Sequence, residues 1–194
     1  MSKGPDYWNA RYAPEAYAYG EWPNDFLQSA VTPTTQGRAI SLCEGEGRNA
    51  VFLALQGYQV TAVDFSEVGL RKAQALAARH GVQIDCVVAD MASLELGNNQ
   101  WDLVVAIFAQ PESHHRQRLY GQLHQALRSQ GQFILESKVE AGASATDRYP
   151  GVDILKSEIK GLTFLQAQET TRELNEGSYH QGMHLTAQIQ AIRF

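Results

Sequence analysis

The sequence has little cysteine: Cys43 and Cys86 are the two cysteines among its 194 residues. Both fall in short apolar segments, and neither belongs to a CxxC or a Cys/His spacing. Such spacings are what zinc sites and small disulfide scaffolds require. We therefore expect two buried, reduced thiols and neither a zinc site nor a disulfide framework.

Long hydrophobic segments are also missing. The longest uninterrupted apolar run is the segment Leu103–Ala109, whereas a membrane-spanning helix needs roughly 20 apolar residues. The N-terminal residues Met1–Tyr7 contain a Gly-Pro pair and an aspartate instead of the basic and apolar regions of a signal peptide. We expect no membrane partner and a cytoplasmic location.

Positive charge is scarce. The chain has 16 Lys and Arg residues against 21 Asp and Glu residues, which gives a formal net charge of -5, and we find no basic cluster in the sequence. A phosphate backbone would be repelled by such a surface. We therefore expect a small-molecule partner and no nucleic acid, and both a monomer and a homodimer remain open.

The chain instead contains alternating strand-like and helical segments. Short β-branched runs are separated by amphipathic stretches that end at glycines, a pattern typical of a mostly parallel sheet with helices on both faces. The predicted strands are Ala39–Cys43, Gln59–Val63, Gln83–Val88, Asp102–Phe108, Gln132–Ser137, Leu162–Gln168 and His184–Arg193. The predicted helices are Arg48–Gln56, a helix from Ser66 to about His80, and one from Pro111 to near Gly131.

These elements predict an α/β fold: a doubly wound, mostly parallel, seven-stranded sheet. The last two strands are joined by the loop Asn175–Gly182 alone, so they should form an antiparallel hairpin at one edge. We expect one domain over residues 1–194, with residues 1–37 as an N-terminal lid and residues 38–194 as the Rossmann-like core.

A glycine turn follows the first predicted strand. Its sequence is Glu44-Gly45-Glu46-Gly47-Arg48-Asn49, and glycine there lets a ligand approach the backbone closely. Asp64 ends the second strand, where its carboxylate can accept hydrogen bonds from both hydroxyls of a ribose. Together these features predict a nucleoside site. The alternative is a glycine helix entry with a capping aspartate and no ligand.

A third acidic position follows the third strand, at Asp90-Met91, and an apolar fourth strand ends before Gln110-Pro111. With these residues the sequence resembles the class I S-adenosylmethionine-dependent methyltransferases, whose acid after the third strand contacts the adenine. The stretch GEGRNAVFLALQGYQVTAVDFSEVGLRK, residues 45–72, resembles the small bacterial branch that contains tellurite-resistance and thiopurine methyltransferases. The segments Tyr19–Asn24 and Glu176–Gly182 extend that resemblance.

The resemblance implies S-adenosylmethionine as the cofactor, but the first motif departs from the family. Ser41 and Cys43 stand where the family has an acid and a third glycine. Glu44 is expected to replace that acid beside the ammonium of the methionyl group. The alternative is that Glu44 caps the following helix.

The N-terminal region is rich in aromatic residues interrupted by Pro14, Gly20 and Pro23, a texture that we do not expect of a packed helix. Aromatic faces can contact a sulfonium and exclude water. By resemblance this segment is a lid, with Tyr19, Gly20, Trp22 and Asn24 nearest to the cofactor and substrate. The alternative is that residues such as Trp8 and Phe26 only anchor the segment to the core.

Three histidines, His114, His115 and His180, are candidates for metal binding, proton transfer or substrate contact. His114 and His115 are neighbours at a helix start, and directions about 100° apart predict that they cannot both bind one ion. We therefore expect no metal site. His114 is a candidate base or substrate contact, or a solvated histidine, and His180 a candidate wall of the site.

The sequence thus predicts methyl transfer to a small acceptor, a thiol or chalcogen compound. A nicotinamide-dependent oxidoreductase and a non-catalytic S-adenosylmethionine-binding protein are the alternatives. The predicted cofactor contacts are Trp22, Glu44, Gly45, Gly47, Asn49, Asp64, Phe65, Asp90, Met91 and Ile107; the predicted catalytic residues are Phe108 and His114; the predicted substrate contacts are Tyr19, Asn24 and His180.

Overall fold

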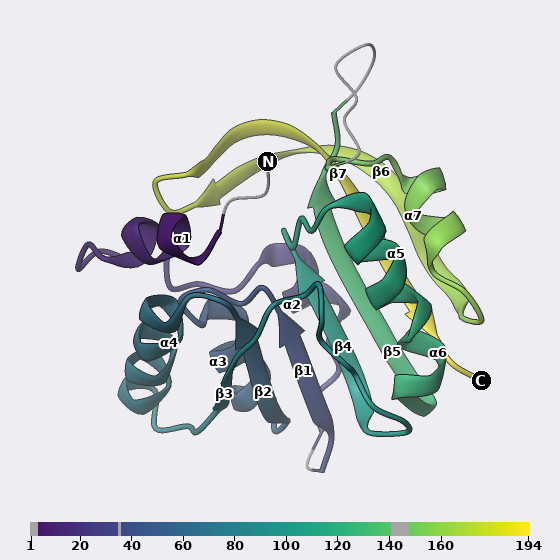
Figure 1. The fold of residues 1–194 in the computed structure, drawn as a ribbon, viewed down its shortest axis with the longest axis horizontal. Coiled ribbons are helices and arrows are strands. Elements are labelled where there is room, and N and C mark those ends of the chain that lie inside the picture. Colours follow the sequence, from purple (N-terminus) through teal and green to yellow (C-terminus); the bar gives the residue numbers. More distant parts are fainter. Residues whose placement is uncertain (1–3, 35, 141–147) are drawn as a thin grey trace.

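The computed structural model describes residues 4–34, 36–140 and 148–194. Its core is a seven-stranded sheet with the order β3-β2-β1-β4-β5-β7-β6 (Figure 1). Strands β1 to β5 are parallel, and β7 is antiparallel to both of its neighbours. The strands are β1 Arg38–Leu42, β2 Gln59–Asp64, β3 Asp85–Val88, β4 Trp101–Ile107, β5 Leu127–Lys138, β6 Thr163–Glu176 and β7 His180–Ile192. The predicted fold class, including the edge hairpin, is confirmed.

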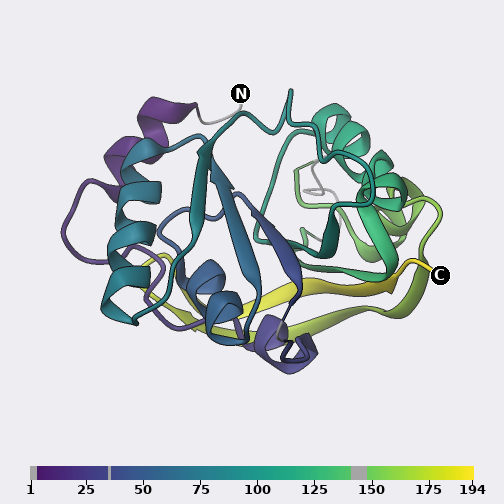
Figure 2. The same ribbon diagram turned by 90° about the horizontal axis from the view of Figure 1, so that it is seen from below.

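Helices cover both faces of this sheet (Figures 1 and 2). Helices α5 to α7 pack on one face, and α2 and α3 pack on the other. In Figure 1, α1 lies near the outer end of the β6–β7 hairpin, beyond the carboxyl ends of the parallel strands. The helices are α1 Pro5–Tyr12, α2 Asp25–Ala30, α3 Arg48–Leu55, α4 Glu67–Arg79, α5 Ser113–Gly121, α6 Leu123–Ala126 and α7 Val152–Glu158.

The apolar core has two main layers because successive side chains of a strand point to opposite faces. In β4, Val104 and Ala106 pack in the layer under α5 and α6, while Leu103 and Val105 pack in the layer under α2 and α3. All four are buried. This explains why the strand reads as a continuous apolar run, as is usual for a parallel strand covered on both sides.

The edge hairpin is longer than predicted. Strand β6 continues to Glu176 and β7 begins at His180, so the predicted loop Asn175–Gly182 shrinks to the turn at 177–179. Residues Glu176 and His180 form the last pair of the ladder. Residues 169–176 of β6 are all polar except Leu174. The sequence therefore shows no alternation of apolar and polar residues there that would predict a strand.

Two helix predictions are wrong. The predicted helix from Pro111 to near Gly131 divides into α5 and α6, and β5 already begins at Leu127, which pairs with Trp101. The aromatic N-terminal segment does contain a helix, α1, which begins with proline at its first position. Trp8 and Tyr12, one turn apart, stack with ring centroids 5.6 Å apart.

The strand order reverses between β1 and β4, and two non-glycine residues with positive φ lie at this point. Cys43, just after β1, has φ 53°, and Phe108, just after β4, has φ 51°. A left-handed conformation is costly for side chains of this size and tends to persist at functional sites. Cys43 therefore lies in a turn, whereas the sequence predicted it inside a strand. Both Cys43 and Cys86 are only partly buried, so the expected full burial of the two thiols is wrong.

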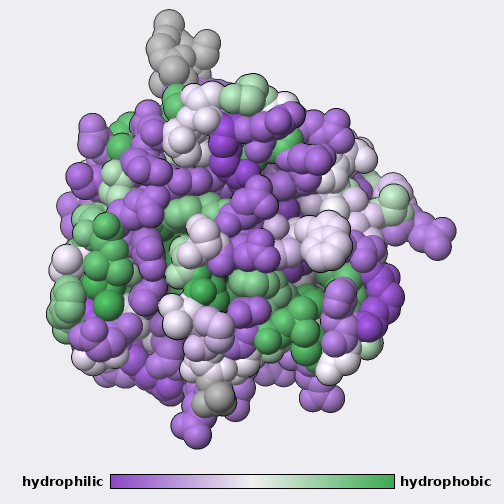
Figure 3. Space-filling view, turned by 180° about the vertical axis from the view of Figure 1, so that it is seen from behind, coloured by the Kyte–Doolittle hydropathy of each residue, from purple (hydrophilic) through white to green (hydrophobic). Residues whose placement is uncertain are grey.

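Among the described residues, no helix has both the length and the apolarity that crossing a membrane would take. The face opposite to the viewer of Figure 1 carries several separate hydrophobic areas between hydrophilic side chains (Figure 3). On that face, therefore, no single apolar surface marks an obvious contact region.

Candidate functional site

A cavity of about 470 Å³ lies at the carboxyl ends of the parallel strands, beside the point where the strand order reverses. Open α/β sheets bind their ligands at this position. Most of the predicted site residues line it: Tyr19, Glu44, Asn49, Asp64, Phe65, Asp90, Met91, Ile107, Phe108 and His180. The structure therefore brings together residues that are up to 161 positions apart in the sequence, from Tyr19 to His180.

Asp64 is a buried carboxylate at the end of β2. One oxygen accepts a hydrogen bond from the backbone N–H of Gly45 (3.0 Å), and the other accepts one from the N–H of Ser66 (2.8 Å). Burial raises its pKa from 3.8 to about 6, against the lowering effect of these hydrogen bonds. A carboxylate has about four acceptor positions, so Asp64, which lines the cavity, keeps capacity for a ligand hydroxyl group beside its backbone hydrogen bonds.

The two glycines of the turn, Gly45 and Gly47, are required because a side chain at either position would collide with neighbouring residues of the protein. A Cβ on Gly45 would lie 2.6 Å from the hydroxyl of Tyr12, and one on Gly47 would lie 2.5 Å from the Cβ of Ala73 in α4. Both glycines also have positive φ, 65° and 95°. Neither is among the residues that line the cavity, so they shape the turn rather than touch its contents.

Glu44 caps helix α3, which is the second of the two roles expected for it from the sequence. One carboxylate oxygen accepts hydrogen bonds from the N–H groups of Asn49 (3.1 Å) and Ala50 (2.9 Å) at the start of α3. The other accepts the hydroxyl of Ser41. Burial raises the pKa of Glu44 despite these bonds. Both oxygens are committed to the helix cap and the neighbouring strand, so a role beside the cofactor ammonium has no support here.

The opposite wall of this end of the cavity follows β3. Asp90 is exposed and lines the cavity, and one of its oxygens accepts the N–H of Ala92 (2.8 Å), which leaves the other oxygen available to a ligand donor. Met91 beside it is buried at 4% exposure. A carboxylate with an adjacent apolar side chain can bind both the edge and the face of a heterocyclic base.

Helix α1 supplies residues that the sequence reading missed. Trp8 and Tyr12 line the cavity, and Tyr12 is buried against Gly45. Burial raises the pKa of Tyr12 well above 10, so its phenol stays protonated and can donate a hydrogen bond. The only signal in the sequence was the aromatic spacing of four residues, which an irregular lid and a helix share.

The segment after α1 is fixed to the core by charged side chains. The ammonium of Lys72 donates to the backbone carbonyls of Pro14 (2.8 Å) and Ala16 (2.9 Å) and forms an ion pair with Glu46 (2.5 Å). Glu46 in turn accepts the N–H of Ala18 (2.7 Å). Glu46 and Lys72 therefore hold this segment across the glycine turn.

The tip of the β6–β7 hairpin closes the cavity from the other side. The ring of His180 lies between those of Phe108 and Tyr19, with centroid separations of 4.4 and 4.6 Å. The guanidinium of Arg11 in α1 lies 3.7 Å from the ring centre of Tyr179. The N-terminal segment and the hairpin tip thus form one continuous wall, as predicted for Tyr19 and His180.

His180 is held near an acidic partner. Its Nδ1 lies 3.6 Å from a carboxylate oxygen of Glu176, too far for a hydrogen bond. Burial lowers the pKa of His180, with Glu176 acting in the opposite direction. The burial of Glu176 would raise its own pKa, but His180, Arg48 and Arg172 outweigh it and hold that pKa at about 2. Burial thus favours the neutral form of His180, which can accept a proton.

Two cationic side chains line the same end of the cavity and were not predicted. Lys138 ends β5, and Arg148 follows the segment 141–147, which lies outside the described residues. The Nε of Arg148 is buried without a hydrogen-bond partner, and burial lowers the pKa of Lys138. Nothing near them in the sequence marked them, because they reach the site only through the strand order.

Trp22 and Asn24, two further predicted residues, also lie outside the cavity. Trp22 is 85% exposed and does not line it, so the structure gives no support to the predicted cofactor contact. Asn24 is fully buried: its amide donates to Glu136 (2.6 Å) and Glu176 (2.9 Å), and its oxygen caps α2 at Leu27. The predicted substrate contact at Asn24 is therefore wrong, because its hydrogen-bonding groups serve the packing of the N-terminal segment.

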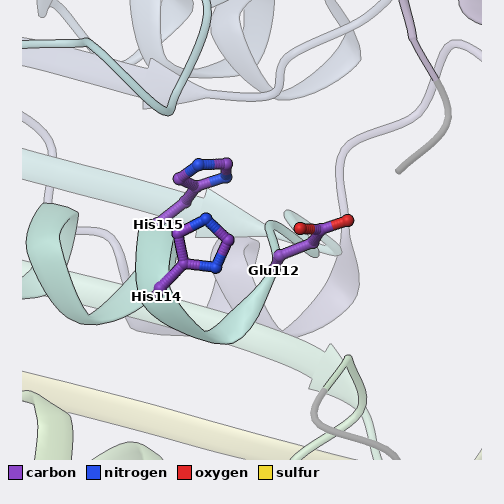
Figure 4. Close-up of side chains that lie close together, drawn as sticks. All are labelled: Glu112, His114 and His115. Carbon is purple, nitrogen blue, oxygen red and sulfur yellow. The ribbon is translucent and has the colours of Figure 1, made fainter. Parts of the chain in front are cut away.

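The histidine pair at the start of α5 differs from the prediction. The rings of His114 and His115 lie 3.8 Å apart between centroids, and the carboxylate of Glu112 is close to both (Figure 4). The expectation that the pair diverges is wrong because the angle of about 100° concerns only the Cβ directions, and the rings can turn toward each other beyond Cβ. His115 lines the cavity, whereas the candidate base His114 is exposed and does not.

Sequence comparison gives one family and one curated relative. Residues 39–131 match the family model described as "Methyltransferase domain". A stretch of 80 residues is 31% identical to Hemagglutinin 1 of Eikenella corrodens and covers 41% of this chain and 26% of that protein. The chain thus spans about a quarter of the length of this relative.

The fold is shared with solved structures over most of the chain. TehB from Haemophilus influenzae superposes with a TM-score of 0.72 and 18% identity, covering 98% of this chain and 67% of that one. A protein from Methanosarcina mazei described among "SAM-dependent methyltransferases" superposes with a TM-score of 0.67 and 14% identity, covering 89% of this chain and 99% of that one. At these identities the likeness establishes the shared fold.

Proposed function

We propose that this chain is a class I methyltransferase that uses S-adenosylmethionine and transfers its methyl group to a small thiolate or other chalcogen anion. The support is that residues 39–131 match the methyltransferase-domain family and that the chain shares its fold with the two solved structures named above. The cavity offers room for both reactants, since it has a volume of about 470 Å³. The remaining question is which end receives which reactant.

The observation that carries the proposal is the division of charge along the cavity. Asp64 and Asp90 stand at the ends of β2 and β3, whereas Lys138 and Arg148 stand beyond β5. Carboxylates suit the hydroxyl and amino donors of an adenosine group, and cations suit an anionic acceptor. Cofactor and acceptor would therefore meet between them, near Phe108.

The cofactor end fits S-adenosylmethionine by its chemistry. Asp64 keeps acceptor capacity for a ribose hydroxyl, and Asp90 with Met91 offers an acceptor and an apolar surface for the adenine. When bound, S-adenosylmethionine supplies a methyl group that its positive sulfur already activates. This chain's residues then have to align the acceptor and exclude water.

The acceptor end suits a nucleophile that is already charged. Lys138 and Arg148 favour an anion, and a cationic neighbour lowers the pKa of a thiol. The rings of Tyr19, Phe108 and His180 provide a polarisable apolar wall around it. Neutral His180 also lies at this end and can take a proton from a thiol that arrives protonated.

We propose further that residues 1–37 act as a lid on residues 38–194 within one domain. Its support is that Trp8, Tyr12 and Tyr19 line the cavity from the N-terminal side. Residues 1–3 and 35 of this lid lie outside the described residues.

Calorimetry tests the cofactor first. We expect S-adenosylhomocysteine to bind one per chain and the oxidised nicotinamide dinucleotide to bind at least about a hundredfold more weakly. Equal or tighter binding of the dinucleotide would favour the oxidoreductase and contradict the proposal. Binding of S-adenosylhomocysteine without turnover of any acceptor would favour a binding protein.

An acceptor panel then tests the substrate class. Thiols, phenols and amines of matched shape are compared by the release of S-adenosylhomocysteine, and thiols are expected to give the highest kcat/KM. His114→Ala should retain most of the activity because His114 does not line the cavity. A preference for phenols or amines would contradict the soft-nucleophile proposal.

A further inference from the structure

Three side chains of types that bind metal ions lie close together beside the cavity, and none of them belongs to the proposed cofactor or acceptor end. Glu112, His114 and His115 each offer one ligand atom, and these atoms all lie within 4.8 Å of one another. All three come from the start of α5, and Figure 4 shows them leaving its first turn close together. The cluster thus joins two imidazoles with one carboxylate on a single structural element.

Among the residues that the structure describes, these side chains have no other polar partner. Glu112 is the N-cap residue of α5, but its carboxylate makes no capping hydrogen bond. Within residues 4–34, 36–140 and 148–194, the one interaction recorded for the side chains of His114 and His115 is the contact between their rings. A buried ion pair does exist one turn further on, between Arg116 and Glu158, so the adjacent cation does not compete for Glu112.

The types of ligand indicate which ion fits. Two imidazoles and one carboxylate suit Zn²⁺ and its neighbours, whereas Mg²⁺ and Ca²⁺ prefer sites made of oxygen alone. With metal–ligand bonds of about 2.0–2.2 Å, the ligand atoms of a tetrahedral site lie about 3.4 Å apart. The observed separations of up to 4.8 Å therefore need a modest side-chain rotation. His114 is exposed and the other two are half-buried, so the ring of His114 has the most room for such a rotation.

We propose that Glu112, His114 and His115 bind one Zn²⁺ ion at the mouth of the cavity. Three protein ligands leave a fourth position for water or another small ligand, as in zinc sites that stay open. Because Glu112 and His115 also line the cavity, that position lies beside its entrance. This proposal stands apart from methyl transfer, since it concerns binding of an ion by residues outside the cofactor end.

Zinc binding is measured directly on the full chain after removal of any affinity tag. Zn²⁺ alone is titrated into the apo-protein by calorimetry, and one ion per chain is expected. Loss of an orienting neighbour alone lowers metal affinity about 10- to 100-fold. His114→Ala and His115→Ala should therefore each weaken binding at least tenfold, and Glu112→Gln should weaken it by a smaller factor.

The matched control is His80→Ala, which removes another exposed histidine at the end of a helix, α4. It should change the affinity by less than twofold. Co²⁺ in place of Zn²⁺ gives a second readout, because its visible absorption should intensify in the wild type and stay weak in His115→Ala. No stoichiometric binding, equal binding by the cluster variants, or an equal loss in His80→Ala would overturn the proposal.

Discussion

The two ends of the cavity differ in charge and in origin. One end of the cavity lies at the carboxyl ends of β2 and β3. It carries Asp64, the last residue of β2, and Asp90, which follows β3. The other end lies where β5 ends and β7 begins. It carries Lys138, Arg148 and His180, which come together because β7 pairs antiparallel with β5. One cavity can therefore bind partners of unlike chemistry, because each end is built from different strands.

The two ends are also held in different ways. Asp64 is fixed by backbone N–H groups of its own turn and the glycine turn. The other end rests on a buried ionic network in which Arg172 donates to both Glu136 and Glu176, and Arg48 donates to Glu176. A local turn tolerates changes elsewhere, whereas a network fails when one member is removed.

The largest effect is expected for Glu136→Ala in this network. Glu136 is fully buried and accepts hydrogen bonds from Asn24, Arg172 and Gln188. Removing one partner of a buried pair leaves charge uncompensated, so the free energy of unfolding should fall by about 3–5 kcal/mol. Urea denaturation measures it. The control Glu67→Ala, which breaks an exposed pair with Arg71, should cost under about 0.5 kcal/mol. Equal losses would refute the network's role.

At the other end, Asp64→Ala should weaken binding of S-adenosylhomocysteine by about 10- to 100-fold. The reason is the loss of hydrogen bonds to a charged group, about 1.5–3 kcal/mol. Calorimetry measures the affinity, with Asp85→Ala on the exposed side of β3 as the control. An unchanged affinity in Asp64→Ala would remove the ribose from this end and reverse the assignment of the two ends.

The pH dependence sharpens the same point. The pKa of Asp64 is raised to about 6, so the free protein loses the carboxylate as the pH falls through 6. Ligand hydroxyls donate stronger hydrogen bonds to the carboxylate than to the neutral acid, so affinity for S-adenosylhomocysteine should fall by up to about tenfold from pH 7.5 to 5. Asp64→Asn should show a flat profile. A flat wild-type profile would mean that the carboxylate is not a ligand contact.

At the acceptor end, Lys138→Met should raise the KM for a thiol by about three- to tenfold. The half-buried ammonium contributes only part of a charge-assisted interaction, which limits the effect. S-adenosylhomocysteine affinity should change by less than twofold, as should both constants in the control Lys160→Met, an exposed lysine. If cofactor affinity fell instead, the division of the cavity would be wrong.

The smallest effect concerns the lid. Helix α1 contacts the core through Trp8 and Tyr12 at the cavity, so a ligand there should slow amide exchange in Pro5–Tyr12 severalfold. Hydrogen exchange with and without S-adenosylhomocysteine measures this, and amides of β4 serve as the internal reference. Equal exchange in both states would make the segment ordinary core.

The sequence predicted that Asp64 and Asp90 lie at the same site because the signals for both residues are local. Asp64 and Asp90 each follow an apolar run, and the glycine turn precedes a helix, so short-range patterns were sufficient. Lys138 and Tyr12 carry no such signal, and their place depends on strand order and on how α1 packs.

Trp22 and Asn24 were predicted at the site but lie away from the cavity, and long-range contacts that the sequence does not show explain this too. Trp22 and Asn24 belong to a short motif that the sequence placed at the site as a unit. In the structure one is exposed and the other is buried in the ionic network. A motif that resembles a family locates a segment, but burial of each side chain is decided by long-range contacts.

A crystal structure of the protein with S-adenosylhomocysteine tests the division of the cavity most directly. We predict a ribose hydroxyl at about 3 Å from the Asp64 carboxylate, the adenine beside Asp90 and Met91, and the sulfur directed toward Phe108 and His180. Lys138 would then remain free of the cofactor. Density for the adenosine group beside Lys138, with Asp64 uncontacted, would contradict the account.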